Sequence, residues 1–186
     1  MGLYTISKFE NANSSGNRYY TNEQSIGNII RYIFRADRWN DEICITYAGV
    51  RNINIREGRP RDIIRGIKKW QEYTGKASGR RMYHYILSFP EKIEPQLVDK
   101  IAREIMDKFF TNMQVVYAVH EDTVNIHVHF ALGAVMMDGR KINFRKKEYF
   151  EMKMRIERYA DNMIYQDDPP LSFMYRQTSL ESLLIC

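Results

Sequence analysis

Apolar and polar positions along the chain form two kinds of pattern that follow one another. Four stretches repeat apolar residues every three or four positions, the spacing of a helix with one buried face. The stretches between them alternate apolar and polar residues, or run apolar between turn-forming residues, as β-strands do. The predicted helices span about 22–35, 61–73, 94–110 and 147–163, and the predicted strands span 3–9, 43–50, 82–89, 114–120 and 126–136.

This order, β-α-β-α-β-α-β-β-α, predicts an α/β (α+β) sandwich. We expect a central, mainly antiparallel sheet of about five strands with helices packed on it. The patterned part ends before Pro169-Pro170, so residues 1–163 are predicted to form one domain. Residues 164–186 are predicted to be a C-terminal tail, either a packed arm, an edge strand or the stub of a removed region.

The two consecutive strands predict a hairpin that carries most of the chain's histidines. The polar segment 121–125 can turn the chain back on itself. Along the second strand, side chains two residues apart point the same way, so His127 and His129 project together, opposite the apolar residues. His120 ends the first strand, and the hairpin brings it beside them.

Three of the four histidines are thereby predicted to converge on one point of the sheet. Imidazole is the commonest protein ligand for divalent metals, and three ligands leave coordination positions open for water or substrate. Solvated histidines on a strand face are the alternative, and the paired spacing with a third histidine favours a metal. Three histidines suit zinc, manganese, iron, copper or nickel, and magnesium if phosphate oxygens complete the shell.

Composition narrows the class of protein. The chain has 186 residues, 44% hydrophobic and 27% charged, which is typical of a globular domain. No apolar run approaches the roughly 20 residues that span a bilayer, so we predict no membrane insertion. The N-terminus lacks the features of a signal peptide, and the two cysteines, Cys44 and Cys186, form no disulfide framework. We expect a reducing, cytoplasmic setting.

Positive charge is concentrated in two segments. Residues 51–81 hold ten Lys or Arg against three Asp or Glu, and residues 140–158 hold eight against three. Residues 161–186 carry one Arg against four acids. Clustered positive charge is the expected footprint of a phosphate-backbone partner. Solubilising surface charge is an equal alternative on composition alone.

The segment His120-x-Asp122-Thr123-x-Asn125-x-His127-x-His129 resembles the metal motif of conjugative relaxases, the mobilisation nucleases of the HUH endonuclease superfamily. The P class of mobilisation proteins is the most similar. Other segments follow the family order over roughly residues 25–163: Ile30-Arg31-Tyr32-Ile33, Tyr83 to Pro90 with its Ser-Phe ending, and Gly139-Arg140-Lys141 before a helix with Tyr149. Val124 and Gly133 depart from residues frequent in the family, and neither is a metal ligand in the motif.

The resemblance implies a DNA relaxase that nicks one strand at a transfer origin by metal-assisted transesterification. Tyr32 would attack the phosphorus and leave a covalent 5′-phosphotyrosine, which conserves bond energy for re-ligation. Phenols ionise only near about pH 10, so the attack needs help from the metal. Manganese or magnesium, or zinc, would be held by the three histidines. Asp122 would orient a histidine or accept the tyrosyl proton, and an ordinary turn acid is an equal reading of it.

The implied partner is single-stranded DNA at the transfer origin of a bacterial plasmid or integrative conjugative element, with an accessory DNA-binding protein and a coupling protein. We expect the two basic segments to form two walls of one DNA groove, with Trp70, Tyr73 and Tyr85 as candidate stacking platforms. Core packing is the stronger expectation for each aromatic residue. The residues predicted to contact DNA are Arg31, Arg35, Arg56, Arg59, Arg61, Arg65, Lys68, Lys69, Ser88, Arg140, Lys141, Arg145, Lys146 and Lys147.

Several alternatives stay open at this stage. Tyr19 and Tyr20 precede the tyrosine-bearing helix and are alternative nucleophiles. A rolling-circle replication initiator or an HUH transposase would instead use Tyr149 or Tyr159 on the last helix. A zinc hydrolase would turn over without an adduct, and a non-catalytic metal-containing nucleic-acid-binding module would not cleave at all. We expect the chain to be a minimal relaxase or an excised nuclease domain. For His84 we expect a strand residue whose hydrogen bonds are satisfied by its neighbours.

Overall fold

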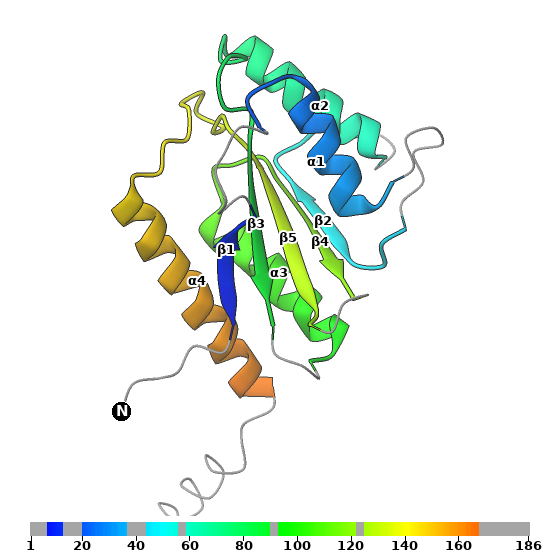
Figure 1. Cartoon of the computed structure of the whole chain (residues 1–186), viewed down its shortest axis with the longest axis vertical. Helices are drawn as coiled ribbons and strands as arrows, with labels where there is room; N and C mark the ends of the chain where they lie inside the picture. Colours follow the sequence, from blue (N-terminus) through cyan, green and yellow to red (C-terminus); the bar gives the residue numbers. More distant parts are fainter. Residues whose placement is uncertain are drawn as a thin grey trace, which may run out of the picture.

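A computed structural model gives the fold of the chain and describes residues 7–12, 20–36, 44–55, 59–89, 93–121 and 125–167 (Figure 1). Five strands form one sheet in the order β1-β3-β5-β4-β2, and each neighbouring pair is antiparallel. The predicted α+β sandwich is thus confirmed. The strands are β1 (Lys8–Asn11), β2 (Ala48–Arg51), β3 (Met82–Ser88), β4 (Val115–His120) and β5 (His127–Gly133). The helices are α1 (Gln24–Phe34), α2 (Pro60–Tyr73), α3 (Pro95–Phe109) and α4 (Lys146–Asp167).

Alternation along the strands gives the sheet two different apolar faces. On one face, isoleucines of α1 and α2 pack against small or branched strand residues that include Val116, Ala118 and Ala131. On the other face, α3 and α4 cover a core rich in aromatic rings, with Tyr85 and Phe130 almost fully buried. Figure 1 shows α1 and α2 side by side, with α4 along the opposite side of the sheet. The chain is therefore a three-layer sandwich of helices, sheet and helices.

Several element boundaries differ from the sequence prediction, and β5 ends at Gly133 rather than at residue 136. The first strand is β1 rather than residues 3–9, and residues 1–6 lie outside the described part. The second strand begins at Ala48 rather than at residue 43. The last helix runs to Asp167, so the predicted domain boundary at residue 163 falls inside α4. Met163 is buried and Ile164 packs on the same core, which explains the extra turn. Residues 168–186, most of the predicted tail, lie outside the described residues.

Helix α1 is held close to the sheet because the strand residues beneath it are small. Ala118 and Ala131 are fully buried under the Ile26, Ile30 and Ile33 side of α1. Near its start, the Asn22 side-chain oxygen accepts a hydrogen bond from Ser25 N at 2.9 Å, which satisfies one N–H group of the first turn. Within the described ranges, no helix is both long and apolar enough to cross a membrane.

Enlarging Ala118 should push α1 away from the sheet. Ala118→Leu adds three carbons to a filled interface, and we expect a loss of about 1–3 kcal/mol in unfolding free energy, measured by urea denaturation. Ala48 is the matched control, because it pairs with Ala118 across β2 and β4 but is exposed. Equal stability of Ala118→Leu and Ala48→Leu would contradict this account of the interface.

Candidate metal centre and active site

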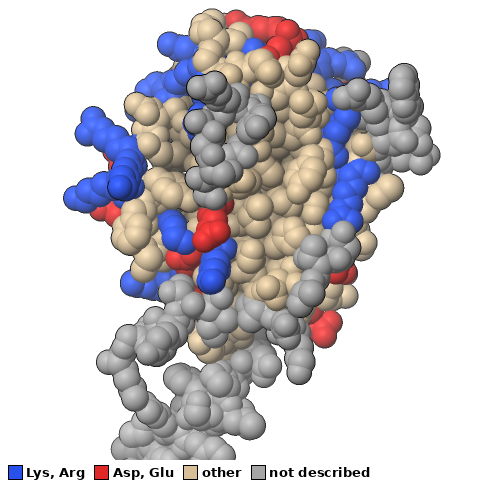
Figure 2. Space-filling view, viewed as in Figure 1, with Lys and Arg blue, Asp and Glu red and all other residues tan. Residues whose placement is uncertain are grey.

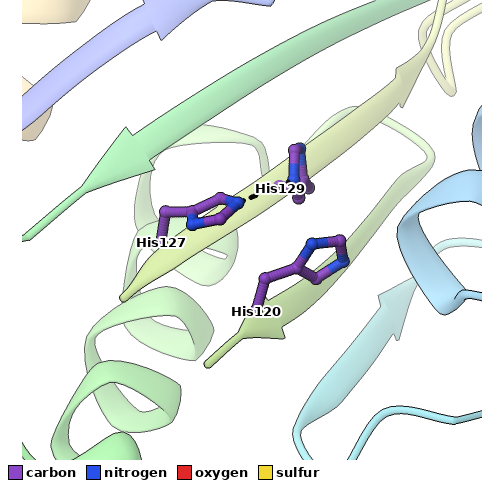
Figure 3. Close-up of side chains that lie close together, drawn as sticks. All are labelled: His120, His127 and His129. Atoms are coloured by element: carbon purple, nitrogen blue, oxygen red, sulfur yellow. Dashed lines mark hydrogen bonds between the residues drawn. The ribbon is translucent and has the colours of Figure 1, made fainter. Parts of the chain in front are cut away.

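The three predicted ligand histidines come together at one end of the central strands. His120 of β4 and His127 of β5 are directly opposite one another, and His129 lies two residues further along β5. One ring nitrogen from each of the three residues lies within 4.8 Å of the others. Figure 3 shows the rings converging from the two strands. His120 and His129 are buried, and His127 is partly exposed, which leaves one side of the cluster open.

Hydrogen bonds to backbone oxygens fix which nitrogens carry lone pairs. His120 Nε2 donates to Ile33 O at 2.8 Å, and His127 Nδ1 donates to Asn125 O at 3.2 Å. The lone pairs then lie on His120 Nδ1 and His127 Nε2. His127 Nε2 is 3.1 Å from His129 Nε2, so basic nitrogens face one another at short range. This donor set fits a divalent cation that accepts nitrogen ligands.

A fourth histidine extends the cluster behind His129. His84 of β3 places Nε2 at 2.8 Å from His129 Nδ1, and its own Nδ1 lies 3.0 Å from the Tyr20 hydroxyl. If His129 Nδ1 donates to His84, and His84 Nδ1 donates to Tyr20, then His129 Nε2 presents its lone pair to the cluster. Both ring nitrogens of His84 therefore have hydrogen-bond partners, as expected, and one of these partners, His129, is a candidate metal ligand. Contacts of this kind orient metal-binding histidines.

Burial keeps the inner histidines neutral. It lowers the pKa of His84 to about 4, with a smaller contribution from His120. Burial also lowers the pKa of His129 well below its usual value, and His84, His120, His127 and Arg35 lower it further. At neutral pH these imidazoles are bases with available lone pairs, as metal binding requires.

Tyr32 stands beside this cluster on α1. Its ring centroid lies 5.4 Å from that of His129, 6.0 Å from His84 and 6.2 Å from His120. The residue is 59% exposed although its helix neighbours Ile30 and Ile33 are fully buried. The helix therefore anchors Tyr32 on its buried side and presents the phenol to solvent next to the histidines.

Two surface depressions flank Tyr32. One of about 610 Å³ is lined by Asn28, Arg31, Tyr32, Arg35, Ala36 and His120. The other, of about 430 Å³, includes Tyr20, Asn28, Tyr32 and His84. Asn28 lies one helical turn before Tyr32 and lines both, so the two hollows adjoin along α1. A polymer chain passing over the histidines would meet Tyr32 between them.

Arg35 brings a positive charge to the histidines by an uncommon backbone conformation. It ends α1 with φ of +50°, in the left-handed region that glycine usually occupies at this position. Its Nη2 donates to His120 Nδ1 at 3.4 Å. A charged residue in a conformation that favours glycine indicates that the side chain is needed there. A guanidinium at this place suits an anionic group bound over the histidines.

A comparison with known protein families identifies the family of the domain. A family model described as the MobA/VirD2-like nuclease domain of relaxases matches residues 32–163. The chain belongs to this relaxase family. The match begins at Tyr32 and includes all four histidines, so the DNA-relaxase role that the motif order implied is supported.

A curated protein and a solved structure are also similar to this chain. Protein rlx of Staphylococcus aureus is 28% identical over 88 residues, which make up 46% of this chain and 27% of that protein. The match thus covers about a quarter of that relative's length. A solved structure described as "Molecular Basis of Vancomycin Resistance Transfer in Staphylococcus aureus" superposes with a TM-score of 0.60 at 12% identity. That superposition covers 88% of this chain and 94% of the other, and it shows that the two chains share a fold.

The predicted basic residues do not form two facing walls. Arg59, Arg61, Arg65, Lys68 and Lys69 lie on or beside α2, on the histidine face of the sheet, whereas Lys146 and Lys147 begin α4 on the opposite face. Figure 2 shows Lys and Arg mostly along the margins of the viewed face. Amphipathic helices bury their apolar sides on different layers, so two basic segments need not face each other.

The other residues predicted to contact DNA lie in several different places. Lys68 pairs with Glu23 at 2.6 Å, Arg140 pairs with Asp138 at 2.8 Å, and Lys141 donates to Ser78 O. Arg145 is exposed before α4, and Ser88 lies directly opposite His127 across β3 and β5. Tyr85, a candidate stacking platform, is instead buried against Phe9 and Tyr149 on the other face. Arg56, Asp122 and Tyr19 lie outside the described residues.

The tyrosines of the last helix are remote from the histidines. Tyr149 stacks on Tyr85, and the Tyr159 hydroxyl hydrogen-bonds to the Glu104 carboxylate on the α3 side. Both contacts lie on the face of the sheet that α3 and α4 cover. A replication-initiator arrangement with its nucleophile on α4 is therefore disfavoured.

Sequence reasoning offered Tyr20 only as an alternative nucleophile, gave no role to Asn28, and treated His84 as a strand residue with satisfied hydrogen bonds. Alternation on β3 already put His84 and Ser88 on one side of the strand. The missing information was that β3 pairs with β5, which sets Ser88 opposite His127 and Ile86 opposite His129. Tyr20 precedes α1 without any pattern of its own, so no sequence signal indicated its contact with His84.

Removing the His84 imidazole should weaken metal binding. His84→Ala leaves the His129 tautomer unfixed, and we expect 10- to 100-fold lower affinity for Co²⁺ or Mn²⁺, measured by calorimetry and by the Co²⁺ absorption spectrum. His84→Gln retains an acceptor for His129 Nδ1 and should recover part of the loss. Wild-type affinity in His84→Ala would contradict the positioning role.

The metal-free protein should lose stability as the pH is lowered from about 6.5 to about 4. The folded pKa of His84 is lowered to about 4, whereas the unfolded chain takes up the proton near pH 6.5. The unfolded state then binds more protons in this window, so unfolding becomes easier by about 1.4 kcal/mol per pH unit for each such histidine. Urea unfolding in EDTA should show a shallower pH dependence for His84→Gln. Parallel curves would disprove this linkage.

Proposed function

We propose that this chain nicks one strand of DNA at a transfer origin by transesterification, with Tyr32 as the nucleophile. The observation that carries the proposal is the placement of an exposed tyrosine against a converging histidine cluster. No other tyrosine in the described ranges combines this exposure with contacts to three of the histidines. The family assignment supports a relaxase nuclease, and the geometry supports this particular residue.

In the proposed reaction the Tyr32 Oη–phosphorus bond forms as the bond from phosphorus to the 3′ oxygen breaks. Tyr32 loses its proton, and the departing 3′ oxygen gains one and becomes a hydroxyl. The strand is left with a 5′-phosphotyrosine, and the same steps in reverse rejoin it. Asp122, two residues beyond the end of β4, is the proposed acceptor of the tyrosyl proton.

His120, His127 and His129 are the proposed ligands of a divalent ion. When bound, such an ion (Mn²⁺, Mg²⁺ or Zn²⁺) supplies positive charge to the phosphate oxygens of the substrate. His84 and Tyr20 hold His129 with its Nε2 lone pair toward the site. Arg31 and Arg35 border the depression next to Tyr32, where their guanidinium groups attract the phosphate backbone.

In this proposal the single-stranded DNA runs along α1. Asn28 and Tyr32 stand between the two adjoining depressions, so the scissile phosphate lies near Tyr32 and the flanking nucleotides occupy the hollows on either side. Ser88 of β3, which lies opposite His127, is placed to hydrogen-bond the same DNA strand. We also propose a bacterial cytoplasmic setting on a mobile element, with an accessory DNA-binding protein and a coupling protein.

The deciding experiment looks for the covalent adduct. The protein is incubated with labelled single strands tiled across the transfer origin of its own element, with Mn²⁺ or Mg²⁺, and resolved by denaturing electrophoresis. We expect an adduct in wild type that falls at least 1,000-fold in Tyr32→Phe, because the nucleophilic oxygen is gone, an effect of the order that covalent catalysis supplies.

Tyr20→Phe is the matched control, since Tyr20 lies in the same site but contacts His84. It should form the adduct at a reduced rate. An adduct that persists in Tyr32→Phe and disappears in Tyr20→Phe would move the nucleophile. Cleavage without adduct would support a metal-water hydrolase, and DNA binding without reaction in the metal-loaded protein would support a non-catalytic binding module.

A further inference from the structure

A third depression, of about 670 Å³, lies at the opposite end of the central strands from the histidines. It is bordered by Gln114, which precedes β4 and whose backbone oxygen accepts a hydrogen bond from Gly133 N at 2.9 Å. His127 begins β5 and Gly133 ends it, which at about 3.3 Å per residue separates the two sites by about 20 Å. The proposed nicking chemistry uses no residue of this depression.

One helical stripe of α2 forms its long wall. Asp62, Arg65, Lys69 and Tyr73 follow one another at spacings of three and four, so they share a face of the helix. Gly66 lies within the stripe, and a side chain there would come within 2.7 Å of Ile53 Cγ2. The glycine thus lets the segment after β2 approach α2, with Asn52 and Asn54 at the opposite border.

A stacked aromatic pair closes one end of the depression. The Trp70 and Tyr73 rings are 5.7 Å apart at an angle of 26°. Trp70 is fixed because its Nε1 donates to Met136 O at 3.1 Å. Tyr73 is 84% exposed, so Trp70 covers one side of its ring and solvent reaches the other. A planar base can extend this stack, and base–aromatic stacking contributes about 1–3 kcal/mol per base.

The wall also offers both kinds of polar group that a nucleotide needs. Arg65 and Lys69 are exposed cations on the same helix face, suited to phosphate. Asp62 and Gln114 are more than nine-tenths buried, yet Asp62 Oδ2 and Gln114 Oε1 have no hydrogen-bond partner among the described residues. Gln114 Nε2 donates to Asn52 O, which fixes its amide orientation and leaves Oε1 as the acceptor. Buried acceptors without donors are costly and point to a ligand that supplies N–H groups.

We infer that this depression is a second binding subsite for single-stranded DNA. One base stacks on the open side of Tyr73. Because Asp62 lies about 16 Å from Tyr73 along α2, a second base further along the strand donates its N–H groups toward Asp62 and Gln114, and the phosphates between the two bases contact Arg65 and Lys69. The inference deepens the proposed function and rests on it, because the strand held here continues toward Tyr32 on the same face of the sheet. The subsite adds affinity and fixes the register of the strand, and it takes no part in bond breaking.

The test measures DNA binding without chemistry. The full chain in EDTA is titrated into a fluorescein-labelled mixed-sequence single strand of about 30 nucleotides, long enough to span both sites. Anisotropy should show about ten-fold weaker binding for Tyr73→Ala and near wild-type binding for Tyr73→Phe, which keeps the ring. Arg65→Ala with Lys69→Ala should lower the slope of log K against log salt by about 1–2.

Matched controls lie on the other side of the sheet. Phe150 on α4 is 58% exposed and Lys100 on α3 is exposed, so Phe150→Ala and Lys100→Ala remove similar groups away from α2. Both should bind like wild type. Binding by Tyr73→Ala within two-fold of wild type, with its thermal unfolding unchanged, would overturn the subsite.

The outcome is separable from that of the nicking experiment. If wild type forms no adduct but Tyr73→Ala still weakens binding, the subsite stands and the proposed chemistry fails. If the adduct forms and Tyr73→Ala binds normally, the chemistry stands and the subsite fails.

Discussion

The pairing register of β4 with β5 is the constraint on which the rest of the site depends. It sets His120 opposite His127 and Ala118 opposite His129. A slip of one residue would turn every side chain of one strand to the other face and separate the histidines. The register is held from the opposite face, where Tyr117 and Phe130 are directly paired and buried. The aromatic core under α3 and α4 thus specifies the arrangement of the polar groups on the α1 side.

The histidine cluster must be shielded from water so that its imidazoles stay neutral, and it must also remain accessible to a substrate. Burial under α1 keeps His84 and His129 neutral, and each imidazole needs a partner for its N–H group. Ile33 O, Asn125 O and the His84–Tyr20 pair meet that need and turn the remaining lone pairs inward. The same α1 that excludes water on its isoleucine side presents Tyr32, Arg31 and Arg35 at its outer edge. One amphipathic helix therefore shields the histidine cluster and borders the two depressions beside Tyr32.

Local patterns predicted the parts of this arrangement that depend on nearby residues. The spacing of Ile26, Ile30 and Ile33 identified α1 and its buried face, and the alternation through His127 and His129 identified β5 and the histidine cluster. The pairing of β3 with β5 joins segments about 40 residues apart, and no local pattern encodes it. For that reason the contact between His84 and His129 was not foreseen. The prediction that the two basic segments face each other was wrong for a related reason. Clustered charge in the sequence does not show which face of the sheet a helix covers.

The inferred DNA contacts of α2 lie about 20 Å from the histidines along β5, which separates binding of the strand from its reaction. Contacts made equally before and during bond breaking tighten binding without accelerating the chemical step. They can still restrict the strand to one register, so that the scissile phosphate reaches Tyr32 without a separate search, and this lowers the entropic cost of alignment. Tyr32 is largely exposed, so a strand held in one register would present its scissile phosphate to the phenol more often than a strand free to slide. In the proposed function, α2 selects where the strand lies and α1 with the histidines determines what happens to it.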